Sequence, residues 1–244
     1  PMRNKLLRIN PNTAQLNAAP VDITVAESVL KGCFGTLFAN YPDFESLTWD
    51  RVDDTVLISV TEDSSFISLS ADCKIRYGDT YSTDFPTLLV KIATDKALSR
   101  AEITAVRPVQ FPQAAAVGNA PNDGIEGLAF DNEGNLYLAL EQNAANAPMI
   151  FKTTYDSSFW QQEGYVNVQD TAFMLPVPDE KDHPINDLDY LPSPKTGHPG
   201  YLVAVARNDD QLWIIDISQQ QRPFVQPMAY YAPTPADSKC PAYE

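Results

Sequence analysis

A β-hairpin pattern stands out in the middle of the chain. Two short apolar runs, Ile125–Phe130 and Leu136–Leu140, are separated by the turn-forming sequence DNEGN. Within the first run Glu126, Leu128 and Phe130 fall on one face at a period of two, with Gly127 and Ala129 on the other. Alternation of this kind on either side of a tight turn predicts two antiparallel strands.

The same succession of an alternating strand and an apolar strand occurs twice more, at 43–60 and at 184–205. Glu45 stands 81 residues before Glu126, and Asn186 stands 60 residues after it. Repeats of this length, each built from four short strands, are typical of a β-propeller. The first repeat is longer because of a polar excursion at 62–86, which we expect to form a small hairpin with strands at 66–69 and 74–76.

We therefore predict an all-β fold, a β-propeller of four-stranded antiparallel blades in which residues 1–244 form a single domain or propeller segment. The expected parts are a partial blade at 1–30, blades at about 43–110, 123–170 and 184–231, and an irregular tail at 232–244. These parts add up to about three and a half blades. Closed propellers usually have four to eight blades, and an open fan leaves strand edges unpaired. We expect a segment of a larger propeller, or a ring completed by a second copy or another partner chain.

Composition narrows the choice of partners. The 244 residues carry a net charge of −15, which argues against binding to nucleic acid or to an anionic membrane surface. No run of 18 apolar residues is present, so we expect no membrane span. The acidic balance is compatible with cation binding, and equally with a solvated acidic surface.

The three cysteines, Cys33, Cys73 and Cys240, form no C-x-x-C pair, which argues against a zinc site or a thioredoxin-type motif. Cys33 and Cys73 flank the first predicted hairpin and could form a disulfide, as in an oxidising compartment. Three unpaired thiols are the alternative.

Candidate site residues gather at one end of the predicted blades. In an antiparallel pair, the start of the first strand and the end of the second strand meet at the same rim. Carboxylate and amide oxygens there suit Ca²⁺. The candidate metal ligands are Glu45, Glu126, Glu141 and Asp187. The alternative is that each carboxylate accepts hydrogen bonds from the backbone of the neighbouring blade.

Three further residues could act on a substrate at this mouth. His183, just before a first strand, is the candidate general base, although a loop histidine is often only a surface residue. Arg207 and Asn208, after a second strand, could bind an anionic or polar substrate group. Arg207 could equally neutralise nearby acids. No G-x-S-x-G elbow or phosphate-binding glycine loop is present.

The sequence IEGLAFDNEGNLYLALE at 125–141 resembles the propeller proteins grouped as "esterase-like activity of phytase". It is also similar to SdiA-regulated and strictosidine-synthase/gluconolactonase-type propellers. By position, Glu126 and Glu141 match the acids that recur in these families, and Glu45 and Glu62 match less closely. Asn186 and Asn208 replace the acids in the third unit.

The resemblance implies a secreted or periplasmic protein, often with calcium, that sometimes hydrolyses phosphate or carboxylic esters. We therefore expect a cation-binding propeller that could carry out metal-assisted hydrolysis of a small-molecule ester or phosphoester. The alternative is a non-catalytic structural or protein-interaction propeller that assembles with a partner chain.

Overall fold

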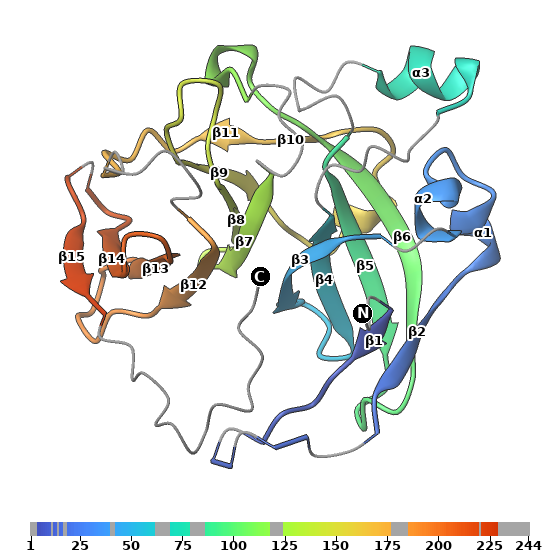
Figure 1. The fold of residues 1–244 in the computed structure, drawn as a ribbon, viewed down its shortest axis with the longest axis horizontal. Helices are drawn as coiled ribbons and strands as arrows, with labels where there is room; N and C mark the ends of the chain where they lie inside the picture. Colours follow the sequence, from blue (N-terminus) through green and yellow to red (C-terminus); the bar gives the residue numbers. More distant parts are fainter. Residues whose placement is uncertain are drawn as a thin grey trace, which may run out of the picture.

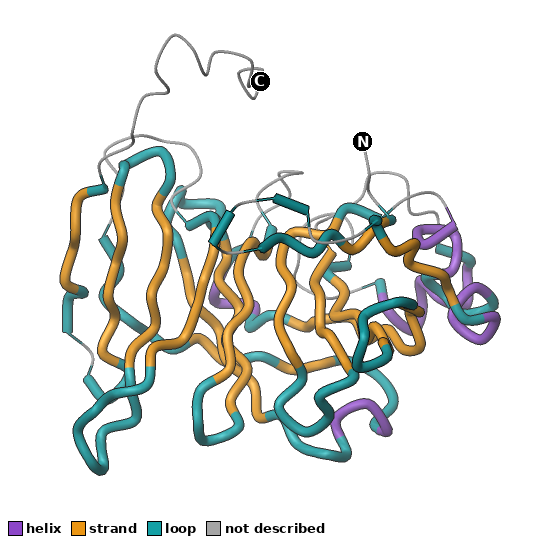
Figure 2. Tube along the Cα trace, turned by 90° about the horizontal axis from the view of Figure 1, so that it is seen from below, coloured by secondary structure: helices purple, strands orange, loops and turns teal. Residues whose placement is uncertain are grey.

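The computed structural model describes residues 4–10, 12–13, 15–16, 19–39, 42–61, 69–78, 86–117, 124–176, 185–219 and 221–228. These residues form three β-sheets that fan out around a common centre, with a few short helices at the edge of the fan (Figure 1). Figure 2 shows that the strands of the three sheets lie roughly along one common axis, with neighbouring strands mostly antiparallel.

The first sheet has the strand order β1-β2-β6-β5-β4-β3. Its strands are β1 (Lys5–Leu6), β2 (Val21–Val25), β3 (Phe44–Trp49), β4 (Val56–Thr61), β5 (Leu88–Thr94) and β6 (Ala101–Gln110). Strands β3 to β6 form the antiparallel meander that the repeat pattern predicts.

The second and third sheets are four-stranded and antiparallel, with orders β11-β9-β8-β7 and β12-β13-β14-β15. The second contains β7 (Ile125–Phe130), β8 (Asn135–Leu140), β9 (Met149–Thr154) and β11 (Gln169–Asp170). The third contains β12 (Asp187–Leu191), β13 (Tyr201–Ala206), β14 (Gln211–Asp216) and β15 (Phe224–Pro227). The three predicted blade hairpins are therefore present.

The innermost strands β3, β7 and β12, called here the inner strands, lie side by side at the centre of the fan (Figure 1). One apolar core fills the space between the first and second sheets, with Ile58 facing Leu128 across it. Another lies between the second and third sheets and contains Tyr137 and Trp213. Sheets that pack face to face around a shared centre in this way have the arrangement of neighbouring β-propeller blades.

Residues 1–30 differ from the sequence prediction. We expected them to form the outer half of a separate blade, but β2 pairs in parallel with β6, and β1 pairs with β2. Both strands thus extend the first sheet. The physical reason is that the outer edge of β6 offers unpaired N–H and C=O groups, which β2 satisfies.

The predicted fourth strand of the second sheet is divided in two. Its first part, β10 (Val166–Asn167), pairs in parallel with the end of β6 in the first sheet. Its second part, β11, pairs with β9 in the second sheet. One short segment therefore ties two neighbouring sheets together by backbone hydrogen bonds.

Helices cover the outward face of the first sheet, the face turned away from the second sheet. Helices α1 (Glu27–Leu30) and α2 (Gly35–Ala39) bring Leu37 and Phe38 into a core with Val90 and Ile92 of the sheet. Two 3₁₀ turns, η1 (Gln113–Ala115) and η2 (Phe159–Gln161), lie in connections. Within the described residues, no helix is long and apolar enough to cross a membrane.

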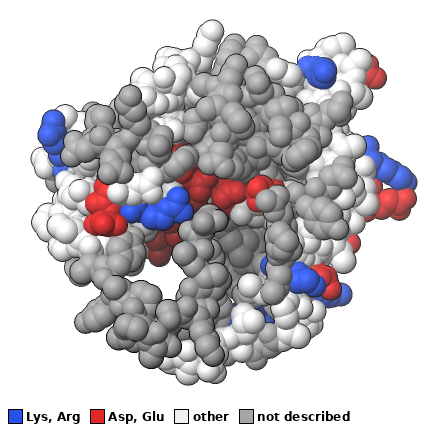
Figure 3. Space-filling view, viewed as in Figure 1, with Lys and Arg blue, Asp and Glu red and all other residues white. Residues whose placement is uncertain are grey.

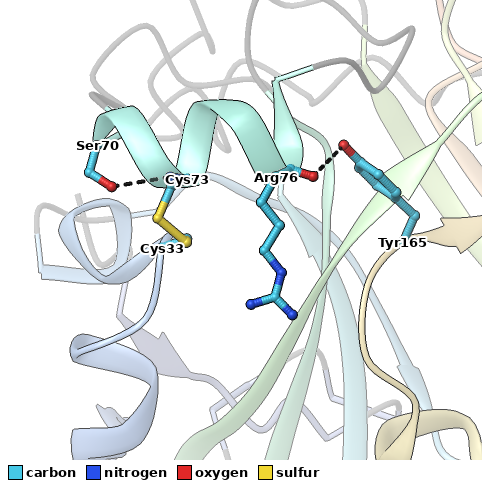
Figure 4. Close-up of a disulfide and its surroundings, with 5 residues drawn as sticks. All are labelled: Cys33, Ser70, Cys73, Arg76 and Tyr165. Carbon is cyan, nitrogen blue, oxygen red and sulfur yellow. Dashed lines mark hydrogen bonds between the residues drawn. A yellow bond between two sulfur atoms is a disulfide. The ribbon is translucent and has the colours of Figure 1, made fainter.

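A third helix, α3 (Ala71–Tyr77), replaces the strand that we expected at 74–76. The Ser70 side chain accepts a hydrogen bond from the backbone N–H of Cys73 at 3.3 Å and caps the helix. Cys73 forms a disulfide with Cys33, as the sequence allowed, and Tyr165 Oη donates to the Arg76 carbonyl (Figure 4). The predicted tail at 232–244 and Cys240 lie outside the described residues.

Candidate functional site

The predicted meeting of strand ends occurs at one end of the inner strands, which we call the inner mouth. In the second sheet Ile125 pairs with Leu140, and the backbone N–H of Glu141 donates to Gly124 O at 2.9 Å. In the third sheet Asn186 N donates to Val205 O at 2.8 Å. The ends of β8 and β13 therefore lie beside the starts of β7 and β12.

Glu141 is the best-defined carboxylate of the inner mouth. It is only 3% exposed, and its Oε1 accepts a hydrogen bond from Asn186 Nδ2 at 3.1 Å. Asn186 Oδ1 in turn accepts from the backbone N–H of Arg207 at 3.0 Å. A buried carboxylate is costly unless polar groups compensate it. The amide of Asn186 does so from the next sheet and thus joins the second sheet to the third.

Glu126 and Asp187 come from adjacent inner strands. A Cβ atom placed on Gly127 would lie 2.6 Å from Leu188 Cβ and 2.9 Å from the carbonyl carbon of Asp187. The backbones of β7 and β12 therefore approach closely next to both acids. Glu126 lies at an irregularity in the pairing of β7 with β8, and its side chain is half-buried. Figure 3 shows acidic side chains gathered across the middle of this face of the molecule.

Glu45 belongs to the third inner strand. The hydroxyl of its neighbour Ser46 accepts a hydrogen bond from Leu128 N at 3.0 Å, which joins β3 to β7. Glu45 itself is half-buried and lines a hollow of about 310 Å³ together with Lys5 and Leu47, on the outward side of β3. The three acids thus belong to neighbouring inner strands, and Glu45 lines a hollow of its own.

Asp187 has a perturbed proton affinity. Its side chain is reached by solvent, but the surrounding protein reduces the hydration of the carboxylate and raises its pKa above the usual value. The nearby charge of Asp189 also raises the pKa, whereas the hydrogen bond from Leu188 N to Asp187 Oδ1, at 2.8 Å, lowers it. Asp187 therefore holds a proton at higher pH than an ordinary aspartate.

Of the remaining predicted residues, Arg207 and Asn208 lie at the same end. Arg207 and Asn208 directly follow β13 and are exposed. His183 and Glu62 lie outside the described residues, so their positions stay predictions. Carboxylate and amide oxygens are of the type that Ca²⁺ prefers. Among the described residues, however, no three His, Cys, Asp or Glu side chains come together as a metal-binding group.

A second polar cluster, which the sequence pattern did not indicate, lies in the loops of the third sheet. His198 Nε2 is 3.2 Å from Asp216 Oδ1 and 3.4 Å from Ser218 Oγ. Ser218 Oγ donates to Asp216 at 2.7 Å, and His198 Nδ1 accepts from Gly200 N at 3.0 Å. A Ser-His-Asp relay needs the acid and the serine on different ring nitrogens. Here one nitrogen faces both, so the cluster stabilises its loop and is not arranged as a triad.

No protein-family model matches the chain, and no curated protein matches it. Solved structures do. A 6-phosphogluconolactonase candidate from Bacteroides fragilis is 15% identical, with a TM-score of 0.39, and the match covers 92% of this chain and 50% of that one. The major allergen Mala s 1 of Malassezia sympodialis is 11% identical, with a TM-score of 0.46 and coverages of 91% and 71%.

An α-L-arabinanase from Penicillium chrysogenum, solved with arabinobiose, is 12% identical, with a TM-score of 0.37 and coverages of 74% and 44%. The chain thus spans about half the length of the Bacteroides protein. At these TM-scores the similarity identifies neither a family nor an activity, and the description as propeller blades rests on the sheets of this chain.

Proposed function

We propose that the inner mouth is the ligand site of a hydrolase-type β-propeller and that Ca²⁺ binds there to Glu126 and Glu141. The main support is Glu141, a buried carboxylate at the junction of two sheets, held by the Asn186 amide from the neighbouring sheet. Acids buried at a channel mouth are frequent in ligand sites because burial perturbs their proton and cation affinities. Glu45, beside its hollow, would contribute from the third inner strand.

The proposed substrate is a small-molecule ester or phosphoester. A bound divalent cation would polarise an ester or phosphoryl oxygen. Asp187, whose pKa is raised, would keep a proton available for the leaving oxygen. Arg207 and Asn208 would hold a phosphate or carboxylate group of the substrate, since a guanidinium binds such groups through paired hydrogen bonds. His183 remains the proposed general base.

Calorimetric titration with CaCl₂ tests the cation site. We expect the wild-type chain to bind Ca²⁺ and Glu141→Gln to bind at least about tenfold more weakly, because the variant removes one charged ligand. The matched control is Glu163→Gln, which changes an exposed acid that pairs with Arg76 of α3 and is not part of the inner mouth. A wild-type chain that binds no Ca²⁺ would refute the cation site.

Activity is tested separately, with p-nitrophenyl acetate and p-nitrophenyl phosphate, with and without Ca²⁺. We expect hydrolysis of one of the two by the wild type, a large loss in Glu141→Gln, and a rate close to wild type in Glu163→Gln. Equal rates in the wild type and Glu141→Gln would show that the inner mouth does not carry the activity.

We also propose that the protein is secreted or periplasmic. The Cys33–Cys73 disulfide supports this, because such bonds persist mainly in oxidising compartments. Thiol titration of unfolded protein recovered from the periplasm and from the cytoplasm of an expression host checks it, with fewer free thiols expected in the periplasmic sample.

A second candidate function is a non-catalytic structural or protein-interaction propeller that assembles with a partner chain. One observation favours it. The outward face of the third sheet, turned away from the second sheet, is apolar and partly exposed, with the Phe224 side chain 63% exposed.

A further inference from the structure

The outward face of the third sheet has the pattern of a buried interface. We define this open face by the side chains that point away from the second sheet on the four strands of the third sheet. These are Asp187, Asp189, Leu191, Tyr201, Val203, Val205, Leu212, Ile214, Asp216, Phe224 and Gln226.

The strand registers show which positions are equivalent in the second and third sheets. In the second sheet Ala139 lies between Gly127 and Ile150, and in the third sheet Val205 lies between Asp187 and Leu212. Ala139 and Ile150 are buried against the third sheet. Their equivalents, Val205 and Leu212, are also apolar but remain only half-buried. The open face therefore repeats the apolar centre of an interface that already exists within the molecule.

The inner strand β12 of the open face differs from β7, the inner strand of the existing interface. Gly127 and Ala129 of β7 are small and let β12 approach closely, whereas the equivalent residues of β12 are Asp187 and Asp189. The described residues of the open face include no lysine or arginine. A partner that covers the face must therefore combine apolar side chains with basic ones.

The opposite end of the same molecule offers such a surface. We call it the amino-terminal end and define it by the apolar residues that β1, its hairpin and β3 expose. They are Leu7, Ile9, Leu16, Leu47 and Trp49, with exposures between 44% and 59%. Lys5 and Arg8 lie between these side chains on the β1 segment, where Lys5 pairs with Asp22 and Arg8 donates to the Ala97 carbonyl at 2.8 Å. Figure 1 shows β1 and the third sheet at the two ends of the arc of sheets.

We propose that the open face of one chain docks head-to-tail onto the amino-terminal end of a second copy. The alternative pairing, open face on open face, would bring two rows of Asp187 and Asp189 into one interface without a basic residue from that face. Head-to-tail docking instead places these acids near Lys5 and Arg8. Such heterologous contacts close into a ring when the rotation allows and otherwise form a filament. The proposal shares Asp187 with the proposed hydrolase site but does not depend on cation binding at the inner mouth.

The test is the oligomeric state of the full chain, measured by sedimentation velocity over a concentration series. Ile214→Glu places a charge in the open face, and Leu47→Glu places one in the amino-terminal end. We expect each variant to associate more than about tenfold more weakly than the wild type, because an unpaired charge resists burial. The control is Ile75→Glu, on α3 and 86% exposed, which should associate like the wild type.

Mixing the two variants gives the sharper result. The intact open face of Leu47→Glu can still meet the intact amino-terminal end of Ile214→Glu, so the mixture should form dimers that neither variant forms alone. A monomeric wild type, or a mixture that stays monomeric, overturns the proposal. So does association that Ile214→Glu abolishes and Leu47→Glu leaves unchanged, which would indicate face-to-face pairing.

Two further variants keep the test decisive. If Ile214→Glu does not fold, Phe224→Glu replaces it, because that side chain lies on the same face and is largely exposed already. Glu141→Gln should associate like the wild type, so that failure of the cation proposal and failure of the docking proposal give different results.

Discussion

The outward faces of the first and third sheets differ in what covers them. Each face belongs to a twisted antiparallel sheet with apolar residues along its middle strands. On the first sheet, helices α1 and α2 cover that face, and Leu37 and Phe38 become fully buried against Val90 and Ile92. On the third sheet no described element covers the face, and Phe224 remains exposed.

The difference shows that the strand pattern alone does not decide whether a sheet face is buried. The segment before β3 supplies helices that fit the first sheet, whereas the described residues after β15 supply none. Repeat structures need terminal units whose outer face is covered or polar, because each unit otherwise buries only one side. Among the described residues, helices cover the middle of the outward face of the first sheet but leave Leu47 and Trp49 of β3 exposed, whereas nothing covers the outward face of the third sheet. Association between these two ends is therefore proposed.

The largest effect should come from removing a side chain of the covered face. Phe38→Ala deletes a ring that is 2% exposed, and we expect it to lower the free energy of unfolding by about 3–5 kcal/mol. Phe224→Ala on the open face should change it by less than about 0.5 kcal/mol. Urea denaturation of dilute protein measures both. Similar losses for the two variants would mean that the open face is covered in the isolated chain.

Removing the disulfide should have the second-largest effect on stability, because the bond links the segment between α1 and α2 to α3 (Figure 4). Cys33 and Cys73 are 40 residues apart, so the bond restricts a long loop of the unfolded chain. We expect the double variant Cys33→Ala/Cys73→Ala to lose about 2–4 kcal/mol of stability. Dithiothreitol should destabilise the wild type and leave the double variant unchanged. A reductant effect on the double variant would point to another cysteine.

Local patterns predicted the strands well, because alternation and turn residues act over a few positions. The hairpin at 125–141 is an example. The Asp131 carboxylate is almost fully buried and accepts hydrogen bonds from Glu133 N at 2.8 Å and Asn135 N at 2.9 Å. These contacts join residues at most four positions apart, so the local sequence is enough to determine the turn. The parallel pairing of β2 with β6 has no such local signal. Helix α3 was missed because the residues at 74–76 gain their helical state from the Ser70 cap and the disulfide.

The candidate site was predicted to a similar extent. Antiparallel pairing alone implied that Glu141 lies beside the start of β7, and it does. The pattern could not show that Asn186 would replace an acid in order to bind Glu141 across two sheets. It also could not show the irregularity at Glu126, because the register depends on the neighbouring strand.

Substitutions at equivalent positions of the buried interface and the open face should differ by a smaller amount in their effect on stability. Gly127→Ala would place a methyl group 2.6 Å from Leu188 N, so β12 must move, and we expect a loss of about 1–3 kcal/mol. Asp187→Ala, at the equivalent position of the third sheet, should cost less than about 0.5 kcal/mol. Thermal unfolding at pH 7 compares them. Equal losses would indicate that a neighbour packs against β12 as closely as β12 packs against β7.

The smallest effect concerns the charge of the open face. The raised pKa of Asp187 means that the folded chain binds its proton more tightly than the unfolded chain. This aspartate therefore contributes most stability when protonated, and the contribution falls as pH rises above 3.8, its ordinary pKa, and through the folded-state value. Asp187→Asn removes the titration, so its stability relative to the wild type should improve between acidic and neutral pH in dilute, monomeric samples.

The same substitution should act in the opposite direction once copies associate. Against Lys5 and Arg8 of a second copy, the charged form of Asp187 becomes the favoured one, and asparagine loses that attraction. We therefore expect Asp187→Asn to raise the unfolding free energy of the monomer at pH 7 while weakening self-association, most strongly at low salt, where charges are least screened. Denaturation and sedimentation of the same samples distinguish these effects. A variant that is more stable and associates as strongly as the wild type would show that the acids of the open face meet no basic partner.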